Sequence, residues 1–354
     1  MATNSSTWPD LPRDILSSIA DRLDKKIGVL RLRSICRSWR SALSSFHSDI
    51  NFPLKLPSPL SPSSNFLSLF QRTVYLLSSP QNPSNGGFFL IKLEVRENCP
   101  NTFTLLDPLS TLITFPQPNS SINLLDYRIS VVSESYYVYS DLDSEIKKVV
   151  VARNFFKNGD FVVLGLEFSG GLLIWRFGDD VWTEIEAFGR CFDDIISYNG
   201  KFYATADKKG RLVMIDSRLQ PIDLVPKLMY GDGTCTHLVE CDGDLWLVDE
   251  VFHDIQTRFG VFKLDEKGRF WDYELNLKDC VFFIGDDANF SLLRSEYNGC
   301  IRNVIYSKKV YFGDEGIIGF TKVFDMKTDI SSVMEDSESY VELYNPPSSW
   351  FNPH

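Results

Sequence analysis

The sequence is poor in histidine and has no paired cysteine motif, and these shortages limit the chemistry that the chain can perform. Four histidines and seven cysteines are scattered along 354 residues. The cysteines form no C-x-x-C pair, so we expect reduced thiols, mostly buried. A nucleophile elbow and an ordered Ser/His/Asp set are also missing. The sequence therefore predicts a non-enzymatic protein without a cofactor.

Long apolar runs and an excess of basic residues are missing as well. No stretch has the apolar length needed to span a bilayer, and the first residues lack the basic and then apolar pattern of a signal peptide. Lys and Arg number 36 against 47 Asp and Glu, a net charge of -11. We therefore expect no membrane and no nucleic-acid partner, and a location in the nucleus and/or cytoplasm.

Metal and carboxylate motifs are incomplete. Cys235, His237, Cys241 and His253 match no zinc spacing with two close ligand pairs, so they are interpreted as strand thiols and surface histidines, and no metal is expected. Three Asp pairs are predicted to lie in turns, where Asp bonds its own backbone. These pairs are Asp179-Asp180, Asp193-Asp194 and Asp286-Asp287.

The charge is divided unevenly, which indicates two units with different partners. Residues 1-48 hold eight basic and four acidic groups, a net of +4 that leaves -15 for the remainder. The 44% hydrophobic content, with 14% aromatics, is enough for large cores.

The first forty residues show helical periodicity. After Pro12, Ile15, Leu16 and Ile19 fall on one face of a predicted helix. A short second helix is expected over 27-33, and a third after Ser34 carries Trp39. Three such helices bury little surface alone, so their remaining apolar face implies a partner.

Two segments carry a specific resemblance. Leu11-Pro12-Arg13-Asp14-Ile15-Leu16 and Leu30-Arg31-Leu32-Arg33-Ser34-Ile35-Cys36-Arg37-Ser38-Trp39-Arg40 resemble the F-box signature, over residues 8-46. The resemblance implies binding to the Skp-type adaptor of a cullin ubiquitin ligase, with Trp39 as the expected anchor. The implied adaptor-binding residues are Leu11, Pro12, Ile15, Leu16, Ile19, Leu32, Ile35, Cys36 and Trp39. A nucleic-acid-facing role for the arginines of this segment is disfavoured by the neighbouring acidic residues.

A proline-rich stretch follows the helices. Pro53, Pro57, Pro59 and Pro62 oppose a helix and favour an extended spacer. We therefore expect an F-box at 6-48, a linker at 49-66 and a target-binding domain at 67-354.

The chain after the proline-rich stretch is predicted to form antiparallel sheet with a weak internal repeat. Ile196-Ser197-Tyr198-Asn199-Gly200-Lys201-Phe202-Tyr203 aligns with Val239-Glu240-Cys241-Asp242-Gly243-Asp244-Leu245-Trp246, two hairpins whose turn glycines are 43 residues apart. Gly-led strands ending at Asp216, Asp265 and Asp325 recur, and Trp182 and Trp271 each open a later strand. A blade of a β-propeller spans about 45 residues, which gives about six blades.

This β-rich body resembles the kelch-like propeller domain of a large family of plant F-box proteins. The resemblance rests on the hairpins above, on Asp279-Cys280-Val281-Phe282-Phe283-Ile284-Gly285 and on Asn303-Val304-Ile305-Tyr306. The predicted fold class is mainly β, with a three-helix F-box before a propeller.

The leading functional hypothesis is a substrate receptor: the F-box recruits the ligase, and the propeller holds a protein target that the sequence does not name. Two alternatives stay open. One is a propeller enzyme that binds a small molecule in a central pocket. The other is a scaffold that uses the F-box outside any ligase.

Overall fold

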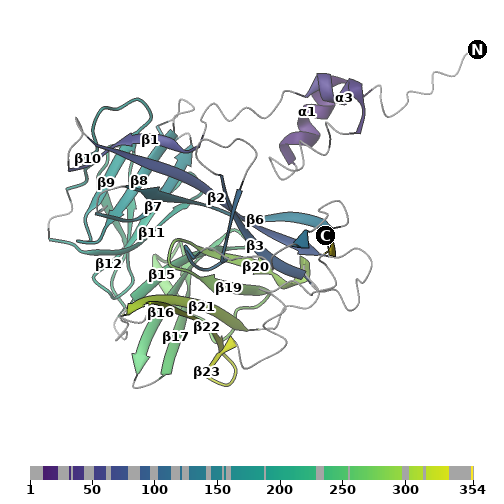
Figure 1. Ribbon diagram of the computed structural model, residues 1–354. Helices are drawn as coiled ribbons and strands as arrows, with labels where there is room; N and C mark the ends of the chain where they lie inside the picture. The colour runs from purple at the N-terminus through teal and green to yellow at the C-terminus, as the bar shows by residue number, and fades with distance from the viewer. Residues whose placement is uncertain are drawn as a thin grey trace, which may run out of the picture. The chain divides into compact units, whose positions relative to one another are not determined.

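The computed structural model divides the chain into two compact units, Met1–Phe52 and Pro53–His354. The residues that the structure describes are 11–22, 32, 35–43, 52–60, 65–78, 88–95, 103–112, 120–121, 127–140, 145–153, 155–156, 161–186, 189–228, 235–253, 256–296, 303–313, 316–334 and 352–353. Each unit is described by itself, and Figure 1 labels their helices and strands.

The first unit, here called the helical unit, contains α1 (Arg13–Arg22) and α3 (Arg37–Ala42). Helix α1 begins directly after Pro12, as the missing N–H of proline allows. Most of the expected helix at 27–33 lies outside the described residues. Helix α3 begins later than expected: its N-cap is Cys36, whose sulfur accepts a hydrogen bond from the Trp39 N–H at 3.4 Å. Cys36 takes this role because its backbone is extended and its side chain reaches back over the first turn.

The second unit, here called the β unit, consists of sheets whose described strands are antiparallel apart from one parallel pair in the fourth sheet. The first has nine strands in the order β10-β9-β8-β7-β6-β2-β3-β4, with β1 paired to β2. Its strands are β1 (Leu54–Pro57), β2 (Phe66–Ser78), β3 (Phe88–Val95), β4 (Phe103–Leu106), β6 (Arg128–Tyr139), β7 (Ile146–Arg153), β8 (Phe161–Glu167), β9 (Leu172–Arg176) and β10 (Thr183–Glu184).

Two four-stranded sheets follow in simple chain order. The second sheet contains β11 (Phe192–Tyr198), β12 (Lys201–Ala206), β13 (Arg211–Ile215) and β14 (Pro221–Val225). The third contains β15 (Cys235–Cys241), β16 (Asp244–His253), β17 (Gln256–Asp265) and β18 (Phe270–Tyr273).

The fourth sheet departs from this meander. Its order is β20-β19-β21-β22-β23, and β19 and β21 run parallel. Its strands are β19 (Cys280–Ile284), β20 (Asn289–Leu293), β21 (Val304–Gly313), β22 (Gly316–Asp325) and β23 (Ile330–Val333). A small further pair joins β5 (Ser120–Ser121) to β24 (Asn352–Pro353).

The sheets close into a ring. Along their innermost strands, β6 pairs with β7, β7 contacts β11, β11 contacts β15, β15 contacts β20 and β20 contacts β6. Hydrophobic clusters fill each interface between successive sheets, including the one that joins the fourth sheet to the first. This is the arrangement of a β-propeller, and it confirms the mainly β fold class.

The described strands give five inner strands, compared with the expectation of about six blades. The expectation divided the chain evenly by about 45 residues per blade. The first sheet does not follow this spacing, because β2 and β6 are long strands of 13 and 12 residues.

The predicted hairpin repeat is confirmed. Asn199-Gly200 and Asp242-Gly243 close the β11–β12 and β15–β16 hairpins, and all four residues have positive φ. That geometry matches the twist of paired strands, which is why Asn-Gly and Asp-Gly recur there. The Asp residues that end β17 and β22 also recur with a function: Asp265 and Asp325 accept N–H bonds from the residues two positions later. Each thereby closes the turn to the outer strand.

Trp182 and Trp271 are buried and play the same role in two sheets. The Trp182 indole N–H donates to the Pro57 carbonyl at 2.8 Å, and that of Trp271 donates to the Gly210 carbonyl at 2.6 Å. The Trp182 bond thus connects the start of β10 to β1. The Trp271 bond connects β18 of the third sheet to the turn before β13 of the second sheet. Gly210 has φ +64, and a Cβ there would lie 2.5 Å from the Leu247 side chain. Position 210 therefore needs glycine.

Two expectations require correction. Part of the predicted linker, Leu54–Pro57, is strand β1, and Leu56 is fully buried. Alternating apolar residues allow this edge strand in spite of its prolines. In addition, Cys241 and Cys280 form a disulfide between β15 and β19, so these cysteines are not reduced thiols. Their separation of 39 residues left no spacing signal in the sequence.

Other cysteines are less buried than expected. Cys191 is exposed, and Cys36 and Cys235 are half-buried. Within the described part of the chain, none of the helices has the length and apolar character needed to cross a membrane.

Candidate functional site

The helical unit separates its apolar residues into a core and a surface. Leu16, Leu32, Trp39 and Leu43 are buried together. Leu11, Ile19 and Cys36 pack against this core and are half-buried. Pro12, Ile15 and Ile35 stay exposed, with exposed fractions of 44% for Ile15 and 61% for Ile35.

This division refines the expected adaptor-binding set. Trp39 is only 5% exposed and Leu16 is fully buried, so both hold the helical unit together. Ile15 and Ile35 carry apolar surface that the unit leaves in solvent, and burying it in a partner would be favourable. The part that Trp39 plays in adaptor binding stays a prediction.

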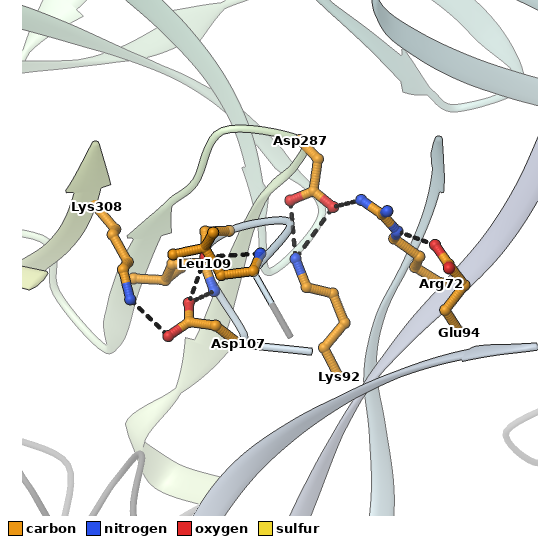
Figure 2. A network of polar contacts seen from close by, with 9 residues as sticks. Arg72, Lys92, Glu94, Asp107, Leu109, Asp287 and Lys308 are labelled. Atoms are coloured by element: carbon orange, nitrogen blue, oxygen red, sulfur yellow. Dashed lines mark hydrogen bonds and ion pairs between the residues drawn. The ribbon is translucent and has the colours of Figure 1, made fainter. Parts of the chain in front are cut away.

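In the β unit, a buried ion network joins the first sheet to the fourth, and Figure 2 shows its members. The ring-closure network consists of Arg72, Lys92, Glu94 and Asp287. Asp287 accepts from Lys92 Nζ at 2.8 Å and from an Arg72 NH group at 2.8 Å, and Arg72 Nε donates to Glu94 at 2.6 Å. Nearby, Lys308 of β21 pairs with Asp107 at 2.7 Å.

Electrostatics within the ring-closure network favour a charged Asp287. Burial alone would raise the pKa of Asp287, but Lys92 and Arg72 hold it below its usual value. Burial lowers the pKa of Lys92, and Asp287 opposes this shift. The network therefore fixes β2 and β3 against the bend between β19 and β20, where the ring closes.

A second polar cluster lies where the inner strands meet. The Asp194 cluster consists of Lys148 of β7, Asp194 of β11, Leu238 of β15 and Asn289 of β20. Asp194 pairs with the Lys148 amine, and accepts the Leu238 N–H at 2.8 Å and the Asn289 amide at 3.0 Å. The Asp194 carboxylate, itself on the second sheet, thus contacts inner strands of the first, third and fourth sheets.

These findings correct the turn prediction for one of the three Asp pairs, because Asp179-Asp180 and Asp286-Asp287 do lie in turn or bend segments between strands. Asp193 and Asp194 are part of β11, and Asp194 is buried. Asp287 does lie in a bend, but its carboxylate belongs to a buried ion network with Lys92 and Arg72. The signal for Asp194 was present in the sequence, because the pair precedes the apolar run Ile195-Ile196 without a turn residue between them.

A cavity of about 480 Å³ lies beside the Asp194 cluster and is lined by β6, β11, β15 and β20. Its polar lining residues include Ser133, Glu134, Ser197, Glu240 and Asn289. Burial raises the pKa of Glu240. The cavity thus offers hydrogen-bonding groups of mainly acidic character.

A third cluster contains three potential metal ligands. The Cys235 cluster consists of Cys235, His237 and Glu250, whose ligand atoms all lie within 4.8 Å of one another. Of the four residues considered from the sequence, Cys235 and His237 come together. Cys241 is instead in the disulfide, and Glu250, across the strand pair, was missed.

The members of the Cys235 cluster are electrostatically coupled. Burial by itself raises the pKa of the Cys235 thiol, but the hydrogen bond from His237 outweighs it and the pKa is lowered. Burial opposes protonation of His237, yet the contacts with Cys235 and Glu250 raise its pKa to about 9. The imidazole thus lowers the pKa of the thiol and the thiol raises the pKa of the imidazole, with Glu250 adding to the shift of His237.

Comparison with known proteins finds a matching family model for each of the two units. Residues 8–51 match the F-box domain model, and residues 60–337 match the KIB1-4 beta-propeller model. The chain is similar to F-box protein SKIP23 of Arabidopsis thaliana, with 26% identity over 98% of this chain and 96% of that protein.

Two further Arabidopsis thaliana proteins are also similar to this chain over most of their length. F-box protein At2g26160 is 28% identical over 84% of this chain and 94% of its own length. F-box protein At2g17036 is 26% identical over 97% of this chain and 94% of its own length. Because the two family models together cover the helical unit and most of the ring of sheets, the chain belongs to the plant F-box proteins that carry a KIB1-4 beta-propeller.

Proposed function

We propose that this protein is the substrate-recognition subunit of an SCF-type cullin ubiquitin ligase. Its helical unit binds the Skp-type adaptor, and its propeller binds a protein target for ubiquitination and degradation. The protein itself is non-catalytic and acts in the nucleus and/or cytoplasm. An F-box in the same chain as a propeller supports a receptor role, because the helices recruit and the loops of a propeller vary to select.

The observation that carries the adaptor proposal is the exposed apolar pair Ile15 and Ile35. Both belong to the helical unit, and neither is part of the cluster of buried residues Leu16, Leu32, Trp39 and Leu43 found among its described residues. A buried aliphatic side chain gains about 1.5–3 kcal/mol over an exposed one, so adaptor docking would be favoured by covering this pair.

The test measures adaptor affinity for the full chain. Ile15→Asp and Ile35→Asp place a charge on the proposed contact, and each is expected to weaken binding of a Skp-type adaptor by about tenfold or more. Leu275→Asp is the matched control, because Leu275 is an exposed leucine of the β unit, 75% exposed. This control is expected to bind the adaptor as the unmodified chain does.

Trp39→Ala separates the core from the contact. It is expected to weaken adaptor binding through unfolding of the helical unit, seen as faster amide exchange in α1 and α3. The Ile variants are expected to keep slow exchange. Unchanged adaptor affinity in both Ile15→Asp and Ile35→Asp would contradict the proposed contact.

Binding of a cullin distinguishes the ligase role from a scaffold role outside the ligase. We expect a cullin to co-purify with the full chain and to be lost in Ile35→Asp. Adaptor binding without a cullin would favour the scaffold.

A second candidate function, binding of a small molecule, is favoured by the polar cavity of about 480 Å³ beside the Asp194 cluster. Its size falls in the range of ligand sites. Glu240→Gln would then lower the affinity of the cavity for a polar ligand and leave adaptor binding unchanged.

A further inference from the structure

The Cys235 cluster presents its three side chains on one face of the third sheet. Residues two apart in a strand point to the same side, which places Cys235 and His237 together. Glu250 lies directly opposite Cys235 in the β15–β16 register. Val239 and Val248 share this face, and both pack in the hydrophobic cluster between the third and fourth sheets. The Cys235 cluster is thus the polar end of that interface.

The opposite face of β15 is held firmly in place. The Thr236 hydroxyl donates to the Thr205 hydroxyl at 2.9 Å, and the Leu238 N–H donates to Asp194 at 2.8 Å. Because these bonds fix the alternate residues of the strand, they also fix the direction of Cys235 and His237. Such support preorganises a site before any ligand arrives.

The donor atoms suit a soft divalent cation. Thiolate and imidazole ligands select zinc over magnesium or calcium, and a carboxylate is a common third ligand. His237 Nε2 and Glu250 Oε2 are 3.2 Å apart. Tetrahedral zinc with Zn–N and Zn–O bonds of about 2.0 Å needs about 3.3 Å between these ligands. This pair therefore already has the spacing of a zinc site.

Charge balance points the same way. To bind a metal, the His237 imidazole would release its proton, and the remaining thiolate and carboxylate would carry two negative charges that a divalent cation neutralises.

We propose that Cys235, His237 and Glu250 form a zinc-binding site with three protein ligands and a fourth position for water. The site lies at the polar end of the interface between the third and fourth sheets. Its existence does not depend on the ligase role, because it is built entirely within the propeller.

The test is a metal titration of the full chain without an affinity tag, after removal of metal with a chelator. One equivalent of Zn²⁺ is expected to bind, and Co²⁺ in its place is expected to give the thiolate charge-transfer and tetrahedral absorption bands. Cys235→Ser is expected to abolish the charge-transfer band. His237→Ala is expected to weaken Zn²⁺ binding by about tenfold or more.

Cys191→Ser is the matched control, because Cys191 is an exposed free thiol outside the cluster. It is expected to keep both bands. Near-ultraviolet circular dichroism checks that Cys235→Ser remains folded. Failure of the folded chain to bind stoichiometric Zn²⁺, or equal binding by Cys235→Ser, would overturn the proposal and leave adaptor binding unaffected.

Discussion

At the scale of single residues, the repeated tryptophans show how one side chain can organise a repeating fold. Trp182 and Trp271 both donate an indole N–H to a backbone carbonyl, of Pro57 and Gly210. Both rings are also buried. The residue supplies a large apolar area and an N–H donor together.

We predict that Trp271→Phe lowers the free energy of unfolding by about 1–3 kcal/mol. Phenylalanine fills much of the space but leaves the buried Gly210 carbonyl without its donor. The measurement is urea unfolding of the full chain. Phe270→Leu, at the neighbouring position that is 47% exposed, serves as the control and is expected to change stability little. Equal stability of Trp271→Phe and the unmodified chain would show that the indole bond contributes nothing.

At the scale of elements, the ring-closure network links strands that are far apart in sequence. Arg72 and Lys92 lie on β2 and β3, and Asp287 follows β19, 195 residues after Lys92. Their side chains are almost fully buried. Removing one partner of a buried ion pair leaves the others without compensation, which costs more than the pair itself contributes.

We predict that Asp287→Asn lowers the free energy of unfolding by about 3–5 kcal/mol, because Lys92 and Arg72 lose their buried counter-charge. Asp329→Asn is the matched control: its pair with Arg258 is 54% exposed on both sides, and the expected change is about 0–1 kcal/mol. Urea unfolding followed by tryptophan fluorescence measures both. Similar losses in the two variants would contradict a special role for the network.

The same network sets a pH dependence. Since Lys92 and Arg72 hold the pKa of Asp287 below its usual value, its contribution is present above the unfolded pKa of about 3.9 and is lost as pH falls through the folded value. Unfolding curves measured at decreasing pH should therefore lose this component in the unmodified chain. The free energy of unfolding of Asp287→Asn should lack this pH-dependent component.

At the scale of the whole molecule, the propeller is a closed ring whose interfaces are filled by separate hydrophobic clusters. The disulfide between Cys241 and Cys280 adds a covalent link between the third and fourth sheets. A cross-link restricts the unfolded chain, and the restriction grows with the length of the loop it closes.

We predict that reduction of this disulfide lowers the free energy of unfolding by about 3–4 kcal/mol, as expected for a loop of 39 residues. The measurement compares urea unfolding with and without a reductant. The double variant Cys241→Ala/Cys280→Ala should be insensitive to reductant, and Cys191→Ser should respond as the unmodified chain does. A chain whose stability does not change on reduction would contradict this contribution.

The local features of the protein followed from its sequence. The F-box motif, the first helix after Pro12 and the Asn-Gly and Asp-Gly hairpins depend on contacts between near neighbours, and spacing records such contacts directly. The Asp residues at the ends of strands were visible for the same reason.

Tertiary structure alone decided which distant residues meet. Asp287 reaches Lys92 and Cys241 reaches Cys280 because packing of successive sheets around the ring brings their strands together. It also decided that Trp39 is in a core while Ile15 and Ile35 face outward. Sequence by itself determined the pattern of helices, strands and turns, since that pattern depends on local backbone preference. The partners of buried charges and thiols depend on closure of the whole ring, which local spacing does not encode.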